Sequence, residues 1–512
     1  MSATLKIYLA AGWGLYILIL SVWIISEKRS PQATIGWLLA LAWVPVVGWL
    51  IYYFFGPQKL KRKQLIRSDS KQLLNNYRAY WQEQVAKALS LYPKPVQDEH
   101  GLEVLEEDPY NQLVGLADHI SIPHVLGRDA RRMSLMIYNM TGLPVSIVQK
   151  FELLEDGDQT FEAICKAIQN AQHTVHLEYY IYEPDTCGTQ LRDLLTEKVR
   201  AGVKVRLLVD WLGSRKVTRA YMADFLTAGG ELAFFHEGIA RHMQPVLNMR
   251  SHRKIVVCDG VVGFTGGINI TDEEVLSLHP QAYHDLHLHI EGPAVYWLEH
   301  VFLEDWHYCT QEIPQDLQPP MPLESVPAQE VQQMQVVASG PDTPDAPLWR
   351  AKLMAINMAK ERVWLATPYF APDESALTAL TSAALRGLDV RLMVPHKSDH
   401  LITTLATRSW YAELLKAGVR IWEYMPRMLH SKTLLVDEQF SFVGTDNFDN
   451  RSFRLNFEVA VLNYERSGAL LLAQQFEKDM SSAQEIRMVD RMSVSRLQRF
   501  LEDLARLLSP LL

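Results

Sequence analysis

The chain has 512 residues, enough for two domains or for one domain that is duplicated. Its formal net charge is −9, from 50 basic and 59 acidic side chains, and 48% of its residues are hydrophobic. This balance provides no broad basic surface and argues against nucleic acid as the main partner. The four cysteines include no C-x-x-C pair, which is typical of reduced thiols in a reducing compartment.

Two long apolar stretches open the chain and predict a pair of transmembrane helices within residues 1–58. The stretch 5–26 carries one charged residue and the stretch 31–58 carries none, so each is long enough to cross a bilayer. Tryptophan and tyrosine side chains in both stretches suit the interface between lipid and water. We expect a hairpin with helices at about 5–26 and 33–55; a hairpin buried in a protein core is the alternative.

A run of basic residues, KLKRK at 59–63, follows the hairpin. By the positive-inside rule this side of the membrane is cytoplasmic, and so is everything that follows. The same charges can attract anionic headgroups. The remainder of the region 59–129 is polar and is predicted to be a helical connection beside the membrane.

From about residue 130 the chain repeats itself, and residues 173–185 match residues 361–373. Each copy reads as strand, helix, strand and helix before one further strand. This order predicts two pseudo-symmetric α/β halves packed on one another, each with a largely parallel or mixed sheet. The predicted parts are half 1 at 130–312, a Pro- and Gln-rich linker with a candidate strand at 313–347, half 2 at 348–490 and an amphipathic C-terminal helix at 491–512.

The C-terminal helix has its leucines at helical spacing from Arg496 onward, with arginines around them. Two positions are open to such a helix: the membrane interface, or the surface of the protein itself.

Each half carries one copy of a short motif: a histidine, a lysine two residues later and an aspartate five residues after that. An asparagine lies 17 residues after the histidine in both copies. One such match arises by chance on the order of a few per cent of the time in a chain of this length, and two with the same tail arise far less often. The motif residues are His252, Lys254, Asp259 and Asn269 in the first copy, and His430, Lys432, Asp437 and Asn447 in the second.

The centre of each motif is apolar and predicts a buried strand, on which alternate side chains share a face. The histidine and lysine of each copy then point the same way, and the aspartate falls at the strand end. A neutral imidazole can attack phosphorus, and a protonated one can give the leaving oxygen its proton. Lysines and asparagines supply charge and donors for phosphoryl oxygens. The set predicts phosphodiester exchange without a metal ion or another cofactor; two surface strands with chance histidines are the alternative.

The motifs resemble the signature of the phospholipase D superfamily, a duplicated H-x-K-x4-D-x6-G-x-x-N. The resemblance implies that one histidine becomes phosphatidylated and the other is the general acid and base, and the family pattern assigns these roles to His252 and His430. It also implies that Asp285 and Glu458 are the acids that orient the histidines. Before Asp285 this chain has Tyr-His, where the family often has Trp-Arg.

The whole arrangement resembles the bacterial cardiolipin synthases within this superfamily, and the resemblance spans nearly the full chain. It implies a multi-pass protein of the bacterial inner membrane with a cytoplasmic catalytic part. The implied reaction transfers a phosphatidyl group from one phosphatidylglycerol to another and yields cardiolipin and glycerol. The family pattern counts Asp259 and Asp437 with the catalytic residues, whereas their place at the strand ends favours bracing of the site.

Other functions remain open from the residues alone. A phospholipase D would use water as the acceptor and produce phosphatidic acid. A membrane-anchored nuclease shares the motif chemistry, but the acidic balance stands against it. A membrane scaffold with a relict site is the non-enzymatic alternative, against which the intact histidines and lysines argue. The sequence also leaves open phosphatidylethanolamine as one of the two lipids, the order in which the histidines act and the oligomeric state.

Overall fold

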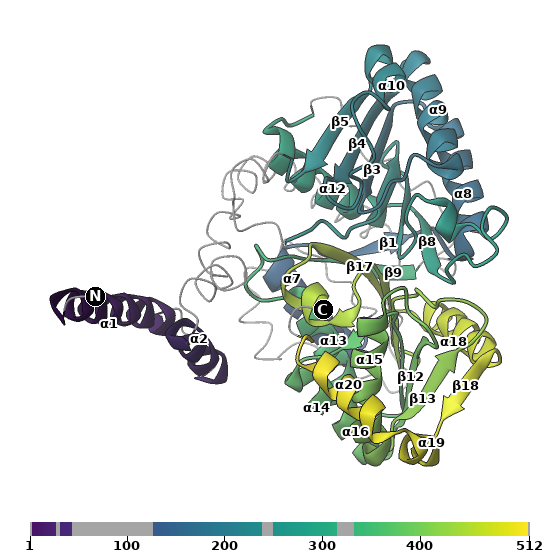
Figure 1. Ribbon diagram of the computed structural model, residues 1–512. Helices are drawn as coiled ribbons and strands as arrows, with labels where there is room; N and C mark the ends of the chain where they lie inside the picture. Colours follow the sequence, from purple (N-terminus) through teal and green to yellow (C-terminus); the bar gives the residue numbers. More distant parts are fainter. Residues whose placement is uncertain (1–2, 27–30, 44–125, 238–248, 315–331, 510–512) are drawn as a thin grey trace, which may run out of the picture. The chain divides into compact units, whose positions relative to one another are not determined.

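The chain divides into two compact units in the computed structural model (Figure 1). The smaller unit contains residues 1–66 and 236–249, and the larger unit contains residues 67–235 and 250–512. The structure describes residues 3–26, 31–43, 126–237, 249–314 and 332–509.

The smaller unit contains two helices that pack on each other, α1 (Ala3–Ser26) and α2 (Pro31–Trp43). Proline suits the first position of α2, because the N–H that it lacks would have no partner inside the helix. Leu20, Ile24 and Leu41 are buried where the helices meet. Among the described residues, no helix has both the length and the apolar character needed to cross a membrane. The remainder of the second expected span, and the basic run at 59–63, lie outside the described residues.

The first sheet of the larger unit has seven strands in the order β2-β8-β7-β6-β3-β4-β5. β3, β4 and β5 run parallel, and the other neighbours pair antiparallel. All residues of β3 are buried, as expected for a strand inside a covered sheet. The strands are β2 (Lys150–Glu155), β3 (Thr174–Tyr179), β4 (Lys204–Asp210), β5 (Glu231–Phe235), β6 (Ile255–Cys258), β7 (Val262–Gly266) and β8 (Leu286–Glu291), and the helices are α8 (Asp156–Asn170), α9 (Thr186–Arg200), α10 (Ala223–Ala228), η2 (Asp272–Glu274) and α12 (Ala294–Thr310).

The second sheet has nine strands in the order β1-β9-β17-β15-β14-β10-β12-β13-β18, and β11 and β16 form a separate pair. The strands are β1 (Val145–Val148), β9 (Gln332–Ser339), β10 (Arg362–Ala366), β11 (Phe370–Ala371), β12 (Asp389–Pro395), β13 (Arg420–Tyr424), β14 (Thr433–Val436), β15 (Phe440–Gly444), β16 (Phe448–Asp449), β17 (Glu458–Asn463) and β18 (Ala483–Ile486). The helices are α7 (Arg128–Thr141), α13 (Pro347–Met358), α14 (Glu374–Leu385), α15 (Leu401–Ser409), α16 (Tyr411–Ala417), α17 (Asn450–Arg454), α18 (Arg466–Met480), α19 (Met488–Ser493) and α20 (Arg496–Arg506).

The two sheets repeat one pattern around the motif strands. β6 lies between β3 and β7, and β14 lies between β10 and β15, with antiparallel pairing in all four cases. β3 pairs parallel with β4, as β10 does with β12. This topology confirms two α/β halves of the same design.

The first strand in the chain, β1, belongs to the second sheet and precedes every strand of the first sheet, which the sequence pattern did not indicate. β1 pairs antiparallel with β9, and α7 packs on α13, so residues 128–148 belong structurally to the second half. β9 was placed inside the expected linker, yet it lies between β1 and β17. Its glutamines gave it a polar appearance, but the buried Gln335 donates to the carbonyls of Ser134 and Leu143, at 3.1 and 2.8 Å.

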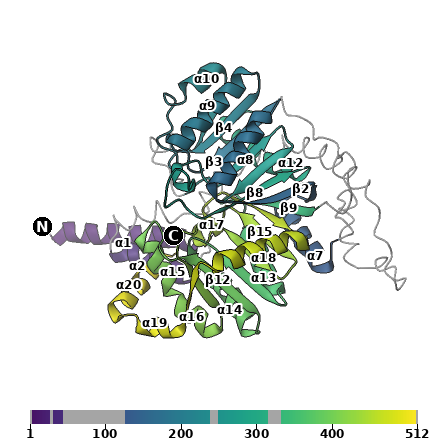
Figure 2. The same cartoon turned by 90° about the vertical axis from the view of Figure 1, so that its right-hand side faces the viewer.

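α12 joins the halves through apolar packing. Thirteen of its 17 residues are buried, as expected for a helix that is apolar on nearly all sides. It contacts β5 and β6 of the first sheet and β1 and β9 of the second, between which Figures 1 and 2 show it. The indole of Trp297 donates to the hydroxyl of Ser146 in β1 at 2.7 Å. The halves therefore share a core next to the motif strands.

Candidate active site

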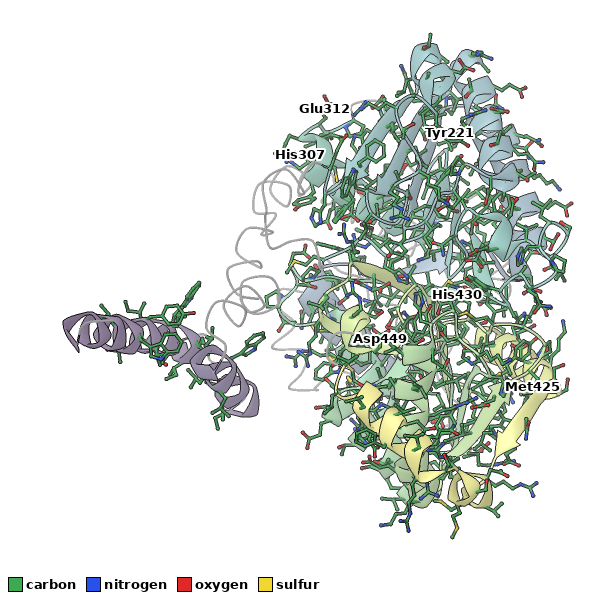
Figure 3. The ribbon with its side chains drawn as sticks, in the orientation of Figure 1. Tyr221, His307, Glu312, Met425, His430 and Asp449 are labelled. Carbon is green, nitrogen blue, oxygen red and sulfur yellow. The ribbon has the colours of Figure 1, made fainter. Side chains whose placement is uncertain are left out.

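The two motif histidines lie just before β6 and β14, where the halves meet. The backbone N–H of His252 donates to the carbonyl of Phe457 at 2.9 Å, and the N–H of His430 donates to the carbonyl of His284 at 2.7 Å. Each histidine is thus bound through its backbone to the opposite half. Figure 3 shows His430 at the junction of the two halves.

Glu458 at the start of β17 orients His252. Its Oε2 lies 3.0 Å from Nδ1 of His252 and also accepts from the hydroxyl of Thr445 at 2.5 Å. Its Oε1 accepts from Ser452 at 2.8 Å and from Asn456 at 3.2 Å. These bonds fix the carboxylate, so the imidazole donates Nδ1–H to it and keeps Nε2 for a substrate.

Asp285, just before β8, stands in the same relation to His430. Its Oδ2 lies 2.7 Å from Nδ1 of His430 and 3.2 Å from Nζ of Lys432, and its Oδ1 accepts from the N–H of Leu286 at 2.7 Å. Both acids were expected to orient a histidine. The structure adds that each acid comes from the half opposite to its histidine.

His284 replaces the arginine that the family often has before the orienting acid. Its Nδ1 lies 2.7 Å from Asp156 and its Nε2 lies 2.8 Å from Asp479. Burial alone would lower its pKa, but the two carboxylates outweigh burial and raise the pKa to about 9. The imidazole is therefore a cation near neutral pH, held between two carboxylates.

The two motif lysines are fully buried beside the histidines. Nζ of Lys254 donates to the carbonyl of His252 at 2.8 Å, and Nζ of Lys432 donates to the carbonyl of His430. Burial, and next the neighbouring charge of Lys432, lower the pKa of Lys254 to about 7. Two buried lysines that repel each other are stabilised when an anion binds between them. The site is therefore suited to a negatively charged phosphodiester.

The environment lowers the pKa of both motif histidines below the ordinary value. Burial lowers the pKa of His252 to about 4, although Glu458 opposes the shift. Burial and the charge of Lys432 also lower the pKa of His430, against the pull of Asp285. A phosphodiester beside them brings negative charge and favours an imidazolium. One histidine can therefore act as nucleophile while the other takes and returns a proton.

The motif asparagines occupy corresponding positions after β7 and β15. Asn269 accepts from the N–H of Ile181 at 3.3 Å and donates its side-chain amide to Glu274 at 3.1 Å. Asn447 is buried, and its Oδ1 has no hydrogen-bond partner among the described residues. Its backbone N–H donates to Ser452 at 3.0 Å, as that of Asn269 donates to Glu274 at 3.1 Å.

The motif aspartates contact backbone N–H groups of neighbouring strands, and their inclusion among the catalytic residues stays a prediction. Asp259 accepts from three successive backbone N–H groups at the start of β3, and Asp437 accepts from three at the start of β10, all at 2.7 to 3.0 Å. Seven residues of extended chain span roughly 20 Å, which puts each aspartate at the far end of its strand. Asp259 instead lines a cavity of about 910 Å³ that includes neither motif histidine. These contacts support the other expectation, that the aspartates brace the strands that carry the site.

Sequence reasoning missed Glu274. Glu274 is 1% exposed, and its Oε1 lies 3.8 Å from Nδ1 of His430. Burial and the charge of Asp285 raise its pKa to about 8. Its sequence, Asp-Glu-Glu, looks like a solvated turn. The rings of Tyr180 and Tyr283 stand 5.0 Å from His252 and 5.2 Å from His430.

Within the part of the chain that the structure describes, two groups of side chains could hold a metal ion by distance: Glu274, Asp285 and His430, and Glu155, Asp156 and His284. In the first group Nζ of Lys432 already lies 3.2 Å from Asp285, and in the second Arg427 donates to Asp156. These cations compete with a metal for the same carboxylates, so neither group is a good fit for one.

Known proteins share this architecture. Residues 164–306 and 353–481 match the family described as "Cardiolipin synthase, PLD-like domain", and residues 14–57 match one described as "Phospholipase_D-nuclease N-terminal". Cardiolipin synthase 1 of Bacillus anthracis is 36% identical over 516 residues, with 99% of this chain and 95% of the relative covered. The cardiolipin synthase of Geobacillus kaustophilus is 37% identical over 490 residues, with 95% and 90% covered.

The crystal structure of phosphatidylserine synthase from Haemophilus influenzae has the same fold, at a TM-score of 0.54 and 13% identity. The alignment covers 74% of this chain and all of that one. Fold and duplicated motif place the chain among proteins with paired phospholipase D-like halves. Within that class it belongs to the cardiolipin synthase family.

Proposed function

We propose that the chain is a phosphatidyltransferase that makes cardiolipin from two molecules of phosphatidylglycerol and releases glycerol. The relatives that match nearly the full chain are cardiolipin synthases, which supports this reaction. The observation that carries the proposal is the pair of histidines, each held at Nδ1 by a carboxylate from the opposite half. Two oriented imidazoles at one junction supply a nucleophile and a proton carrier.

In the first step Nε2 of His252 attacks the phosphorus of a phosphatidylglycerol. An N–P bond forms and the P–O bond to the headgroup glycerol breaks. His430, which enters this step as the imidazolium that the bound phosphodiester and Asp285 favour, gives its Nε2 proton to the leaving oxygen. His252 has the role of nucleophile because the family pattern gives that role to the histidine of the first motif, and burial, which lowers its pKa to about 4, keeps its Nε2 free of a proton. The charge of Glu458 stabilises the imidazole once Nε2 has bonded to phosphorus.

In the second step a hydroxyl of another phosphatidylglycerol attacks the same phosphorus. His430 accepts the hydroxyl proton, the new P–O bond forms, and the N–P bond to His252 breaks. Lys254 and Lys432 balance the charge on the phosphoryl oxygens in both steps, and Asn269 and Asn447 add amide donors. No metal ion takes part in this scheme.

The N-terminal region attaches the enzyme to the bacterial inner membrane in this proposal. Residues 14–57 match a family of N-terminal segments, and the stretches 5–26 and 31–58 are almost free of charge. The basic run at 59–63 then sets the catalytic part on the cytoplasmic side. The proposed substrates are phosphatidylglycerol and, in the reverse direction, cardiolipin.

A product assay tests the reaction. The purified full chain in mixed micelles receives labelled phosphatidylglycerol as its only phospholipid, in the presence of a chelator. Cardiolipin and glycerol should appear in equal amounts. Phosphatidic acid as the main product would make water the acceptor and the protein a phospholipase. Phosphodiester cleavage of a single-stranded oligonucleotide at a similar rate would favour a nuclease.

A trapping experiment tests the two histidine roles. A phosphatidyl ester of p-nitrophenol has a leaving group that needs no proton, so His430→Ala should release one p-nitrophenol per enzyme and accumulate phosphatidyl on His252. His252→Ala should release none. If instead His252→Ala carries the lipid on His430, the two roles are reversed.

A further inference from the structure

α20 packs on the protein with its apolar face directed outward. Phe500 is 62% exposed and Leu504 is 50% exposed, whereas Glu502 on the opposite side is 1% exposed. A helix on the surface of a globular protein normally shows the reverse arrangement. The exposed apolar residues of the helix and its end are Leu497, Phe500, Leu501, Leu504, Leu507 and Leu508.

Polar contacts hold α20 in this orientation. Both oxygens of Glu502 accept from the guanidinium of Arg491, at 2.5 and 3.3 Å, and Gln498 donates to Glu502 at 3.3 Å. Arg506 lies 3.5 Å from the ring centroid of Trp410 and donates to Glu413 at 3.3 Å. The outward direction of the leucines is therefore built into the packing.

The apolar surface continues onto α15, against which α20 packs (Figure 1). Leu401 is 73% exposed and Ile402 is also exposed at the start of α15. Just before them, Asp399 accepts from the hydroxyl of Tyr369 at 2.9 Å, and the ring of Tyr369 stands 6.5 Å from that of His430. The side chain of Tyr369 thus connects one end of this surface to the candidate active site.

The other end of the surface also reaches the site. The carbonyl of Ser509, just past α20, accepts from the side-chain amide of Asn450 at 3.3 Å. Asn450 begins α17, three residues after the motif residue Asn447. The exposed leucines therefore extend along the molecule to the loop that carries a motif residue.

The charge around this surface is positive although the chain as a whole is acidic. Residues 487–508 contain five arginines and three acidic residues, against a net charge of −9 for the chain. Of the three acids, Glu502 is buried against Arg491, and the carboxylate of Asp490 accepts from the N–H of Arg487 at 2.8 Å. An apolar face bordered by arginines is complementary to the interface of an anionic bilayer.

We propose that the exposed face of α15 and α20 inserts into the interface of an anionic bilayer and holds the active site at the level of the headgroups. The surface belongs to the larger unit and acts in addition to the N-terminal helices. This inference rests on the proposed function in one respect: a bilayer substrate gives the surface its use.

Depth quenching in the full chain tests the insertion. A fluorophore is attached at Leu501→Cys, and the control label is at Leu471→Cys, in a background of Cys165→Ser and Cys309→Ser. Both leucines are 41% exposed, but Leu471 lies on α18, which Figures 1 and 2 place across the second sheet from α20. In phosphatidylglycerol vesicles, nitroxide-labelled lipids should quench the label at 501 and not at 471. Phosphatidylcholine vesicles should give weaker quenching.

Each other result of this experiment overturns the proposal. Equal quenching at 501 and 471, or quenching at neither, means that the surface does not insert. A blue shift at 501 without quenching means that protein covers α20; loss of the shift on dilution then indicates a second copy, and its persistence indicates another part of the same chain. None of these readings depends on turnover, so they stand even if cardiolipin is not the product.

An activity comparison separates insertion from a structural role. The double variant Leu501→Asp/Leu504→Asp should lower cardiolipin formation on vesicles on the order of tenfold, because charged groups on the apolar face oppose insertion. On monomeric short-chain phosphatidylglycerol it should stay within about twofold of the parent. The control Leu470→Asp/Leu471→Asp should match the parent on both substrates. Equal loss on both substrates by the α20 variant would contradict the proposal.

Discussion

Glu458 and Asp285 act across the boundary between the halves, so each half supplies the carboxylate that the other half's histidine needs. The contacts are 3.0 Å from Glu458 to His252 and 2.7 Å from Asp285 to His430. A carboxylate in this position fixes the tautomer and stabilises a charged imidazole. The sequence placed both acids near the site, but only the structure could pair them, because each pair joins residues separated by at least 145 positions.

Glu458→Gln should therefore lower kcat by about 100-fold or more, with little change in KM, since the amide keeps the shape and loses the charge. Initial rates with phosphatidylglycerol vesicles measure both constants. Glu299→Gln is the matched control, because Glu299 is a buried acid that lies 2.9 Å from His176, outside the site. A similar loss of kcat in both variants would reduce the role of Glu458 to packing.

The pH profile should report the buried lysine. The pKa of Lys254 is lowered to about 7, so its positive charge is present below that pH and is lost as the pH rises through it. The general acid His430 must also hold a proton, so kcat/KM should fall toward alkaline pH, and loss of the Lys254 charge near pH 7 should make this fall steeper. On the acid side it should fall only as His252, with a pKa of about 4, becomes protonated.

Lys254→Arg tests this assignment, because a guanidinium keeps its charge at any accessible pH. The alkaline fall of kcat/KM should become shallower and extend to higher pH, because only the proton on His430 is then lost, whatever happens to the maximum rate. Lys352→Arg, at a buried lysine 2.6 Å from Asp446, should leave the alkaline fall in place. An unchanged profile in Lys254→Arg would mean that another group controls the alkaline side.

The motif aspartates show how one residue fixes the start of a neighbouring strand. Asp437 has a φ of 54° and gathers three N–H groups at the beginning of β10. Asp437→Ala should reduce the free energy of unfolding by about 2–4 kcal/mol and so lower the unfolding temperature. The substitution leaves the three N–H donors without their acceptor and places alanine at a positive φ, where its backbone is strained.

Asp437→Asn keeps one acceptor oxygen and tolerates the positive φ, so it should lose less stability than the alanine variant. Thermal unfolding compares the variants, and kcat per folded molecule should stay within about threefold of the parent in both. A loss of kcat without a change in unfolding temperature would give Asp437 a role in the chemistry.

At the scale of elements, the sequence predicted those strands and helices that a local pattern of apolar and polar residues determines. The apolar centres of the motifs appear as β6 and β14, and the repeated order of strands and helices appears as two sheets of one topology. Local pattern could not place β9, whose Gln335 reads as a linker residue until its partners, the carbonyls of Ser134 and Leu143, are known. Nor could it decide which face of α20 points outward, because that depends on Arg491 and Glu502.

At the scale of the whole molecule, the duplication has one consequence that sequence alone does not give. β1 precedes the first half in the chain but pairs with β9 of the second, with Ile147 opposite Gln333. A strand that precedes the first half in the chain thus forms one edge of the second sheet. Because α12 of the first half packs on both β1 and β9, β1 also takes part in the contact between the halves.

A chain divided between the halves tests this arrangement. Residues 332–512 alone lack β1 and α7, so β9 becomes an unpaired edge, and we expect this fragment to aggregate. Co-expression with residues 1–314, which carry the N-terminal helices, should keep it free of aggregates in detergent extracts, copurify both fragments and restore cardiolipin formation. Ile147→Pro in the first fragment should weaken copurification, because proline cannot donate to the ladder with β9. If residues 332–512 stay soluble alone and copurify equally well with the Ile147→Pro fragment, the exchange of β1 contributes nothing to the assembly, and packing of α12 must hold the halves together.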